Sequence, residues 1–282
     1  DVSQIRGDAD IKGSLPDGLP AKSINASANI NGQTLSLDAT LETVSFGPTR
    51  AEALVIRATG QPDNADILID MDGRSEINGL TYPTSIDLDA NIKGATRGAL
   101  DVTASLSALM GDIGITTEDS IRFTQYDDGY EASAQFAALG GTLTPSLTTR
   151  GNTAISLNGE GLRIAPLMLI AGRPALDGAL DINLDWTETE SGGLSGPLRT
   201  DIESVARPGS DLPPIDIFLE GQLTPDLLDL VVRALDNQEL EGRIEIDVPV
   251  NTSPAPPFIS RQQGASMPFT AAIDGQIEAI TA

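Results

Sequence analysis

Carboxylates are the most numerous side chains of this sequence that could do chemistry, and many of them recur at every second position. Asp87 and Asp89 alternate with apolar residues, as do Asp70 and Asp72. A pair of carboxylates can hydrolyse a glycoside when burial raises the pKa of one of them. Side chains at this spacing in a strand point to the same side. We expect that side to face water, which leaves the carboxyl pKa values near their usual range.

Two short motifs suggest other chemistry, but each lacks a residue that it needs. A calcium loop at DMDG (70–73) would need an oxygen ligand at the position of Leu68, so we interpret it as a hairpin turn. GGLSG (192–196) displaces the serine of a nucleophile elbow, and without histidine no Ser-His-Asp triad can form. The chain also lacks cysteine, which excludes disulfides and thiolate chemistry. We predict no catalytic residue, no metal site and no cofactor.

The elements that carry these acids are strands with one apolar side. Within residues 85–106, apolar side chains fill every second position on both sides of a glycine-bounded loop at 94–98. The eight apolar residues are Ile86, Leu88, Ala90, Ile92, Leu100, Val102, Ala104 and Leu106. Two strands joined by that loop would place all eight on one face. What covers such a face is the main question that the sequence raises.

The same alternation runs through most of the chain and predicts an all-β meander of antiparallel strands. Such segments are 23–32, 33–41, 53–60, 65–73, 130–141, 153–161, 179–186, 214–223, 242–250 and 268–279. Many carry or are separated by pairs that favour hairpin turns. These pairs are Asn31-Gly32, Asp72-Gly73, Asn78-Gly79, Asp128-Gly129, Asn158-Gly159, Asp177-Gly178 and Asp274-Gly275. Proline-rich stretches at 207–214 and 251–268 predict loops, as does 187–197.

Two segments predict short helices between strands. Residues 161–174 place Pro166 in a first helical turn and Gly172 at the end, and residues 222–238 begin with a Thr224 cap and Pro225. Each segment is followed by a strand that begins with glycine. The sequence therefore predicts two copies of one unit, in which a strand, a helix and a glycine precede a second strand. A soft boundary near 148–152 divides the chain into residues 1–150 and 151–282.

Composition limits the possible partners. The chain has 282 residues, of which 40% are hydrophobic and only 4% aromatic, and its net charge is −24. This charge would repel nucleic acid and disfavours docking on an anionic membrane surface. No apolar run approaches the length of a membrane span. Because the sequence starts without Met and ends in an unfinished strand, we interpret it as an internal piece of a longer protein.

Residues 161–186 and 221–248 resemble the repeating segments of TamB-like proteins. These belong to the AsmA-like group of bridge-type lipid-transfer proteins in the envelope of Gram-negative bacteria. The resemblance rests on the short helix after "L-x-P", the glycine-led amphipathic strand, and endings such as FTAAIDGQIEA (269–279). It implies a long antiparallel sheet, U-shaped in section, with an apolar concave face and a polar convex face. The membrane anchor and C-terminal domain typical of the family are not recognisable in this sequence.

The resemblance also implies a role and partners. The protein would be periplasmic and anchored in the inner membrane through a segment outside this chain. It would work with an outer-membrane TamA-type barrel in phospholipid movement and outer-membrane protein assembly. Its partners would be phospholipid acyl chains, which an apolar trough could hold without polar recognition. The residues expected to line that trough are Ile24, Ile30, Leu35, Leu37, Leu41, Ile86, Leu88, Ile92, Leu100, Val102, Leu180, Ile182, Leu184, Ile244, Ile246 and Val248.

Two other interpretations remain open at this point. Alternating strands also form the inner faces of a β-sandwich or a β-helix, so the chain could be a non-catalytic scaffold or adhesin with a dry core. A polysaccharide-active enzyme with two carboxylates is the third hypothesis. It is disfavoured because Trp186, Tyr82, Tyr126 and Tyr130 are too few to line a sugar platform.

Overall fold

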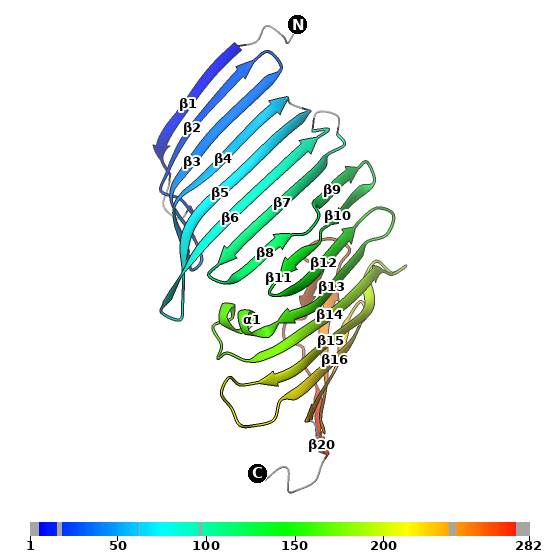
Figure 1. Cartoon of the computed structure of the whole chain (residues 1–282). Helices are drawn as coiled ribbons and strands as arrows, with labels where there is room; N and C mark the ends of the chain where they lie inside the picture. The colour runs from blue at the N-terminus through cyan, green and yellow to red at the C-terminus, as the bar shows by residue number, and fades with distance from the viewer. Residues whose placement is uncertain (1–5, 16–18, 62, 96–97, 237–240, 275–282) are drawn as a thin grey trace. The chain divides into compact units, whose positions relative to one another are not determined.

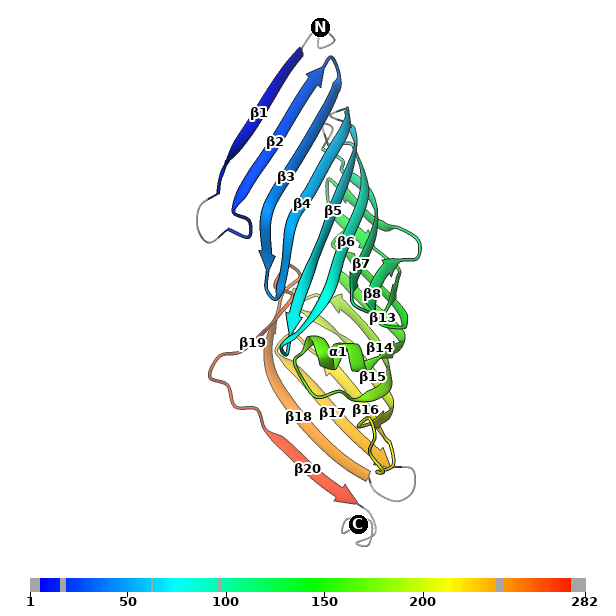
Figure 2. The same ribbon diagram turned by 60° about the vertical axis from the view of Figure 1, so that its left-hand side comes forward.

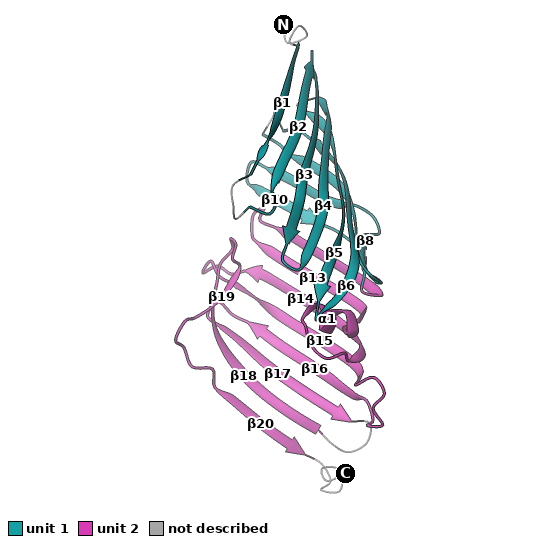
Figure 3. Ribbon diagram, turned by 90° about the vertical axis from the view of Figure 1, so that its left-hand side faces the viewer, with its two compact units in different colours: residues 1–138 teal, residues 139–282 magenta. Residues whose placement is uncertain are grey.

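The fold is all-β, as the alternation predicts. A computed structural model describes residues 6–15, 19–61, 63–95, 98–236 and 241–274. The strands belong to a 20-stranded antiparallel sheet, and the chain divides into two compact units, residues 1–138 and 139–282 (Figures 1 and 3). Each strand pairing resolved along the described chain is antiparallel, whereas a β-helix is built from parallel strands.

Unit 1 consists of strands in nearly sequential order. They are β1 (Arg6–Ser14), β2 (Ser23–Asn31), β3 (Thr34–Phe46), β4 (Thr49–Gln61), β5 (Asn64–Ile77), β6 (Leu80–Lys93), β7 (Asp101–Met110), β8 (Ile113–Thr117), β9 (Ile121–Tyr126), β10 (Gly129–Ser133) and β11 (Phe136–Ala138). Each of β1 to β6 pairs with the next strand, and β7 pairs along its length with both β8 and β9. The predicted strand at 130–141 is therefore divided between β10, β11 and the start of the next unit.

Unit 2 continues the same pattern and contains one short helix. Its elements are β12 (Gly141–Thr148), β13 (Ala154–Arg163), α1 (Ile164–Ile170), β14 (Asp177–Glu188), β15 (Leu194–Ala206), β16 (Ile215–Leu223), β17 (Leu227–Asp236), β18 (Glu241–Thr252), β19 (Ile259–Arg261) and β20 (Phe269–Asp274). Strands β12 to β18 pair in sequence, and β18 then pairs with both β19 and β20. The end of the predicted strand 268–279 lies outside the described residues.

The stretch 85–106 folds as its alternation predicts. In the pairing of β6 with β7, Ile86 lies opposite Ala108, Leu88 opposite Leu106, and Ile92 opposite Val102. Residues directly opposite each other in an antiparallel pair share a face of the sheet. Leu100 lies just before β7 and accepts a hydrogen bond from the Gln125 N–H through its carbonyl oxygen (2.7 Å).

Some of the predicted turns are present, and the pair Asn78-Gly79 shows why. Both residues have positive φ, 53° and 75°, and they connect β5 with β6 as a two-residue loop. A type I′ turn needs positive φ at both central positions, and its twist matches that of the flanking strands. Asn-Gly meets this requirement at little steric cost.

Three other predicted turns, at Gly73, Gly159 and Gly178, are wrong, because these glycines lie within strands β5, β13 and β14, and Gly275 of the pair Asp274-Gly275 lies outside the described residues. Gly73 belongs to β5, where an added Cβ would lie 2.6 Å from the Arg50 carbonyl oxygen at a bulge in β4. Gly159 belongs to β13, where a Cβ would lie 2.7 Å from the Ile182 Cγ2 atom. In both places glycine permits a close approach of neighbouring strands, a use that X-Gly pairs do not distinguish from a turn.

The first predicted helix is present but short. Helix α1 ends in a Schellman motif, in which the Gly172 N–H donates to Leu169 and the Arg173 N–H to Met168. Gly172 has a φ of 66°, which fits the left-handed position that ends such helices. Pro166 lies in the first turn, where a missing N–H costs nothing.

The second predicted helix, 222–238, is wrong, because its core is strand β17. The Thr224 hydroxyl accepts the Leu227 N–H (3.2 Å), as an N-cap would, but the Thr224 N–H donates to the Leu227 carbonyl and closes a hairpin turn. Strand β17 then pairs over nine residues with both β16 and β18. Thr224 thus makes the hydrogen bond of an N-cap, but the backbone after it pairs with the two neighbouring strands β16 and β18 instead of forming a helix.

Packed cores form at limited places in each unit. The unit 1 cluster consists of the buried residues Ala21, Val44, Ala51 and Met71, and Leu15 packs against it. The unit 2 cluster consists of Trp186, Leu194, Leu223 and Val250, and Phe258 and Ile259 pack against it. Phe258 and Ile259 belong to the strap, by which we mean residues 253–268, the connection from β18 to β20 that contains β19 (Figure 2).

Candidate functional site

One face of unit 1 carries four rows of apolar residues that run from β2 to β7, and beyond them the same face continues with the polar residues Ser75 and Thr84. The registers align four rows of six residues across these strands, in which each residue lies opposite the next. The rows are Ile24, Leu41, Leu54, Met71, Ile86, Ala108; Ala26, Ala39, Ile56, Ile69, Leu88, Leu106; Ala28, Leu37, Ala58, Ile67, Ala90, Ala104; and Ile30, Leu35, Gly60, Ala65, Ile92, Val102. We call these residues the unit 1 apolar face.

Unit 2 presents a corresponding apolar face from β13 to β18. Its three complete rows contain one polar residue, Thr200. The rows are Leu157, Leu184, Leu198, Gly221, Leu230, Ile246; Gly159, Ile182, Thr200, Leu219, Val232, Ile244; and Leu162, Leu180, Ile202, Ile217, Ala234, Gly242. We call these residues the unit 2 apolar face. On β20 Phe269 lies opposite Ile246, and it is 71% exposed.

These faces are open rather than packed. No leucine or isoleucine of the unit 1 apolar face is buried, and apart from Met71 its buried residues are alanines. In unit 2, Leu162 is the one buried leucine of the three rows. The interior of a sandwich buries such side chains between two layers. The described part of unit 1 contains one sheet of strands and no helix, so it supplies neither a helical layer nor a second sheet that would cover the face.

Most of the predicted lining residues lie in the rows of these two faces. Fourteen of the sixteen lie in the rows, while Leu100 precedes β7 and Val248 lies opposite Leu228 beside the unit 2 cluster. None of the sixteen is buried. Ile30, Leu35 and Ile244 are exposed by about 40%, and the others are half-buried.

Sequence reasoning missed several residues of the same faces. Leu54, Ile56 and Ile69 lie in the alternating segments 53–60 and 65–73, so the same alternation predicts their place on this face. Leu230 and Val232 were missed because their segment was interpreted as a helix. The alternation of Leu228, Leu230, Val232 and Ala234 is the signal that would have found them.

The opposite face of each unit is predominantly polar, with isolated apolar residues such as Leu68 and Phe218. In unit 1, Arg57 forms an ion pair with Asp38 (3.6 Å), and Asn91 donates a hydrogen bond to Asp66 (2.7 Å). In unit 2, Arg233 pairs with Glu220 (3.2 Å). These groups are solvent-exposed, so their pairs add little to stability. Their main effect is to make one side of each strand compatible with water.

One acid departs from the prediction of ordinary carboxyl pKa values. The pKa of Asp87 is raised by partial desolvation, by a hydrogen bond with the Asp70 carboxyl group, and by repulsion from Asp70 and Asp72. Asp70 and Asp87 lie directly opposite each other on β5 and β6, where like charges repel. Asp87 remains on the exposed polar face, so this shift follows from crowding rather than from an enclosed site.

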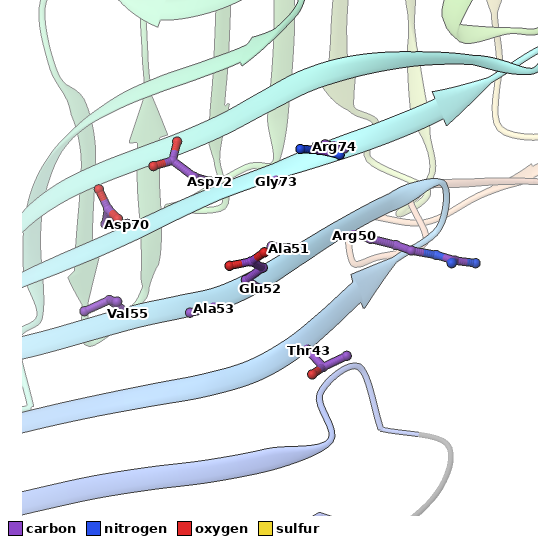
Figure 4. A pocket seen from close by; sticks show the side chains of 10 residues that line it. All are labelled: Thr43, Arg50, Ala51, Glu52, Ala53, Val55, Asp70, Asp72, Gly73 and Arg74. Atoms are coloured by element: carbon purple, nitrogen blue, oxygen red, sulfur yellow. The ribbon is translucent and has the colours of Figure 1, made fainter.

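The polar face also carries a hollow of about 660 Å³ beside the bulge of β4 (Figure 4). Glu52, Asp70 and Asp72 line it together with Arg50 and Arg74. The charges are mixed and exposed, and no group of three acids or other ligands that could hold a metal ion occurs among the described residues. We assign no function to this hollow.

Comparison of the chain with protein-family models, with curated proteins and with solved structures gives no match. Across the described residues, no helix is long and apolar enough to cross a membrane. The two apolar faces are the features of the molecule that point to a function. Each face offers dispersion contacts and no fixed polar partner, a surface suited to alkyl chains and unsuited to polar ligands.

Proposed function

We propose that the apolar faces bind the acyl chains of phospholipids. The observation that carries this proposal is the unit 1 apolar face, in which 24 aligned positions on six strands include no polar side chain, yet no leucine or isoleucine is buried. Exposed apolar patches of this extent mark binding surfaces. Acyl chains would remove that surface from water.

The dimensions and energetics suit a hydrocarbon chain. Strands lie about 4.8 Å apart, so the five steps from β2 to β7 span roughly 24 Å, a length comparable to an extended fatty acyl chain. Each CH₂ group that leaves water contributes about 0.8 kcal/mol. Because the rows repeat the same chemistry from strand to strand, no single position is favoured, and a chain could slide along the face.

The biological setting follows from the resemblance to TamB-like proteins. In this proposal the chain is part of a periplasmic protein, anchored in the inner membrane outside this segment and working with an outer-membrane TamA-type barrel. It would move phospholipid or support outer-membrane protein assembly. Support comes from the first resembling segment, which contains the helix α1 and the strand β14 that follows it. The second segment contains a strand, β17, where the resemblance implies a helix.

The proposal is tested by placing a glutamate on the apolar face of the strand pair β5–β6 and, as a control, a glutamate on its polar face. Leu88 of β6 lies on the unit 1 apolar face, opposite Ile69 of β5. Leu68, the residue before Ile69 on β5, points to the polar face. We expect Leu88→Glu to weaken binding of a phosphatidylcholine with an NBD-labelled acyl chain at least tenfold, because the carboxylate must be desolvated under lipid. Leu68→Glu, opposite Arg57, should bind as the wild type does.

Both variants should keep the far-ultraviolet circular dichroism of the wild type, because Leu88 is not part of a packed core. Equal binding by the two glutamate variants would contradict the proposal. Unfolding of Leu88→Glu alone would contradict it as well, since it would mean that the face is a packed interior.

A further inference from the structure

The indole N–H of Trp186 is buried without a hydrogen-bond acceptor. Trp186 is 9% exposed, and its Nε1 atom has no partner among the residues that the structure describes. Its neighbours in the unit 2 cluster, Leu194, Leu223 and Val250, offer no acceptor side chain. A buried tryptophan N–H usually finds a partner, and leaving it unpaired costs free energy. An unpaired donor in an otherwise apolar cluster therefore requires an explanation.

The position of Trp186 relates this donor to the unit 2 apolar face. Trp186 lies opposite Ile155 on β13, and both Leu184 and Leu228 of the sheet pack against its cluster. An alkyl chain lying along the row of Leu157, Leu184 and Leu198 would pass next to this cluster. Trp186 thus places a hydrogen-bond donor at the end of the face that the cluster closes.

The strap covers this end of the face. Phe258 and Ile259 pack against the cluster but are themselves half-buried. The Thr153 hydroxyl donates to the Pro254 carbonyl oxygen (3.2 Å), and the Gln262 side-chain amide donates to the Val250 carbonyl oxygen (2.8 Å). Phe258 and Ile259 contact the cluster from outside the pairing of β13 to β18, so these two side chains can move without breaking that pairing.

We propose that Trp186 donates a hydrogen bond to the ester carbonyl oxygen of an acyl chain bound on the unit 2 apolar face, after the strap side chains move aside. This inference rests on the proposed acyl-chain binding and adds a polar anchor to it. A neutral carbonyl is the acceptor that fits, because a net charge of −24 disfavours a carboxylate. The anchor would fix one end of a chain that otherwise slides.

The test compares two lipids that differ only at the acceptor. Dioleoyl phosphatidylcholine has ester carbonyls, and its dialkyl ether analogue has the same chains and head group without them. We expect the wild type to bind the diester about tenfold more tightly, the value of one hydrogen bond to a buried donor. Trp186→Phe keeps an aromatic ring but removes the N–H, so it should bind both lipids equally.

A second measurement uses the wild type alone. The chain contains one tryptophan, so its indole N–H gives a single assigned peak in a ¹⁵N–¹H correlation spectrum. The diester should move this peak downfield, and the diether should not. Equal binding of both lipids by the wild type, with equal peak shifts, would overturn the anchor but leave acyl-chain binding intact. Binding of neither lipid would overturn the proposed function as well.

Discussion

Leu219 and Leu223 lie four residues apart on the same face of β16, yet only Leu223 is fully buried. Leu223 belongs to the unit 2 cluster, beneath Phe258 and Ile259 of the strap. Leu219 lies opposite Thr200 and Val232 on the open part of the face. The strand pattern is the same at both places, so the connection that lies over the sheet decides which apolar residues become a core.

Unit 1 shows the same contrast between buried and open parts of an apolar face, but a shorter connection covers the buried part. There the connection from β1 to β2 supplies Leu15 and Ala21, which pack on Val44 and Met71. The Ser45 N–H donates to the Pro20 carbonyl oxygen (2.6 Å) and holds this connection beside β3. Both units thus close one part of an apolar face and leave the rest open.

The largest effect is expected where the face is packed. Leu223→Ala should lower the free energy of unfolding of unit 2 by about 3 kcal/mol, since it removes buried methyl groups and leaves a cavity under the strap. Urea titration followed by Trp186 fluorescence reports this unit specifically, because Trp186 is the only tryptophan of the chain. A cost below about 1 kcal/mol would mean that the cluster is not a core.

A smaller effect is expected four residues away. Leu219→Ala should cost about 1 kcal/mol or less in the same titration, because a half-buried side chain loses less transfer free energy and leaves no closed cavity. In the presence of phosphatidylcholine the difference between Leu219→Ala and the wild type should increase, as bound lipid stabilises the folded state. An equal loss of unfolding free energy in Leu219→Ala and Leu223→Ala would contradict the distinction between the open part and the packed part of the face.

Much of the sheet could be predicted from the sequence, and the failures have physical causes. The alternation of Ile86, Leu88, Ala90 and Ile92 predicts their shared face, because strand side chains alternate strictly. Strand β17 could not be recognised from Thr224 and Pro225, since the same residues begin a helix or close a turn. Pairing with β16 and β18 decides between them, and that is a tertiary effect.

The packed clusters were not predictable for a related reason. Nothing in the local sequence distinguishes Leu223 from Leu219, because the difference comes from Phe258 and Ile259, 35 or more residues away in the chain. The raised pKa of Asp87 likewise depends on the register that places Asp70 opposite it. Patterns in the sequence predict which side of a strand is apolar, whereas contacts between distant segments decide what covers it.

The central claim is that the apolar faces accept acyl chains, and native mass spectrometry tests it most directly. The full chain, stripped of lipid and incubated with an excess of dioleoyl phosphatidylcholine, should carry one or more lipid adducts, and Leu88→Glu should carry fewer than Leu68→Glu. A wild-type spectrum that contains only the bare chain at every lipid concentration would contradict the account.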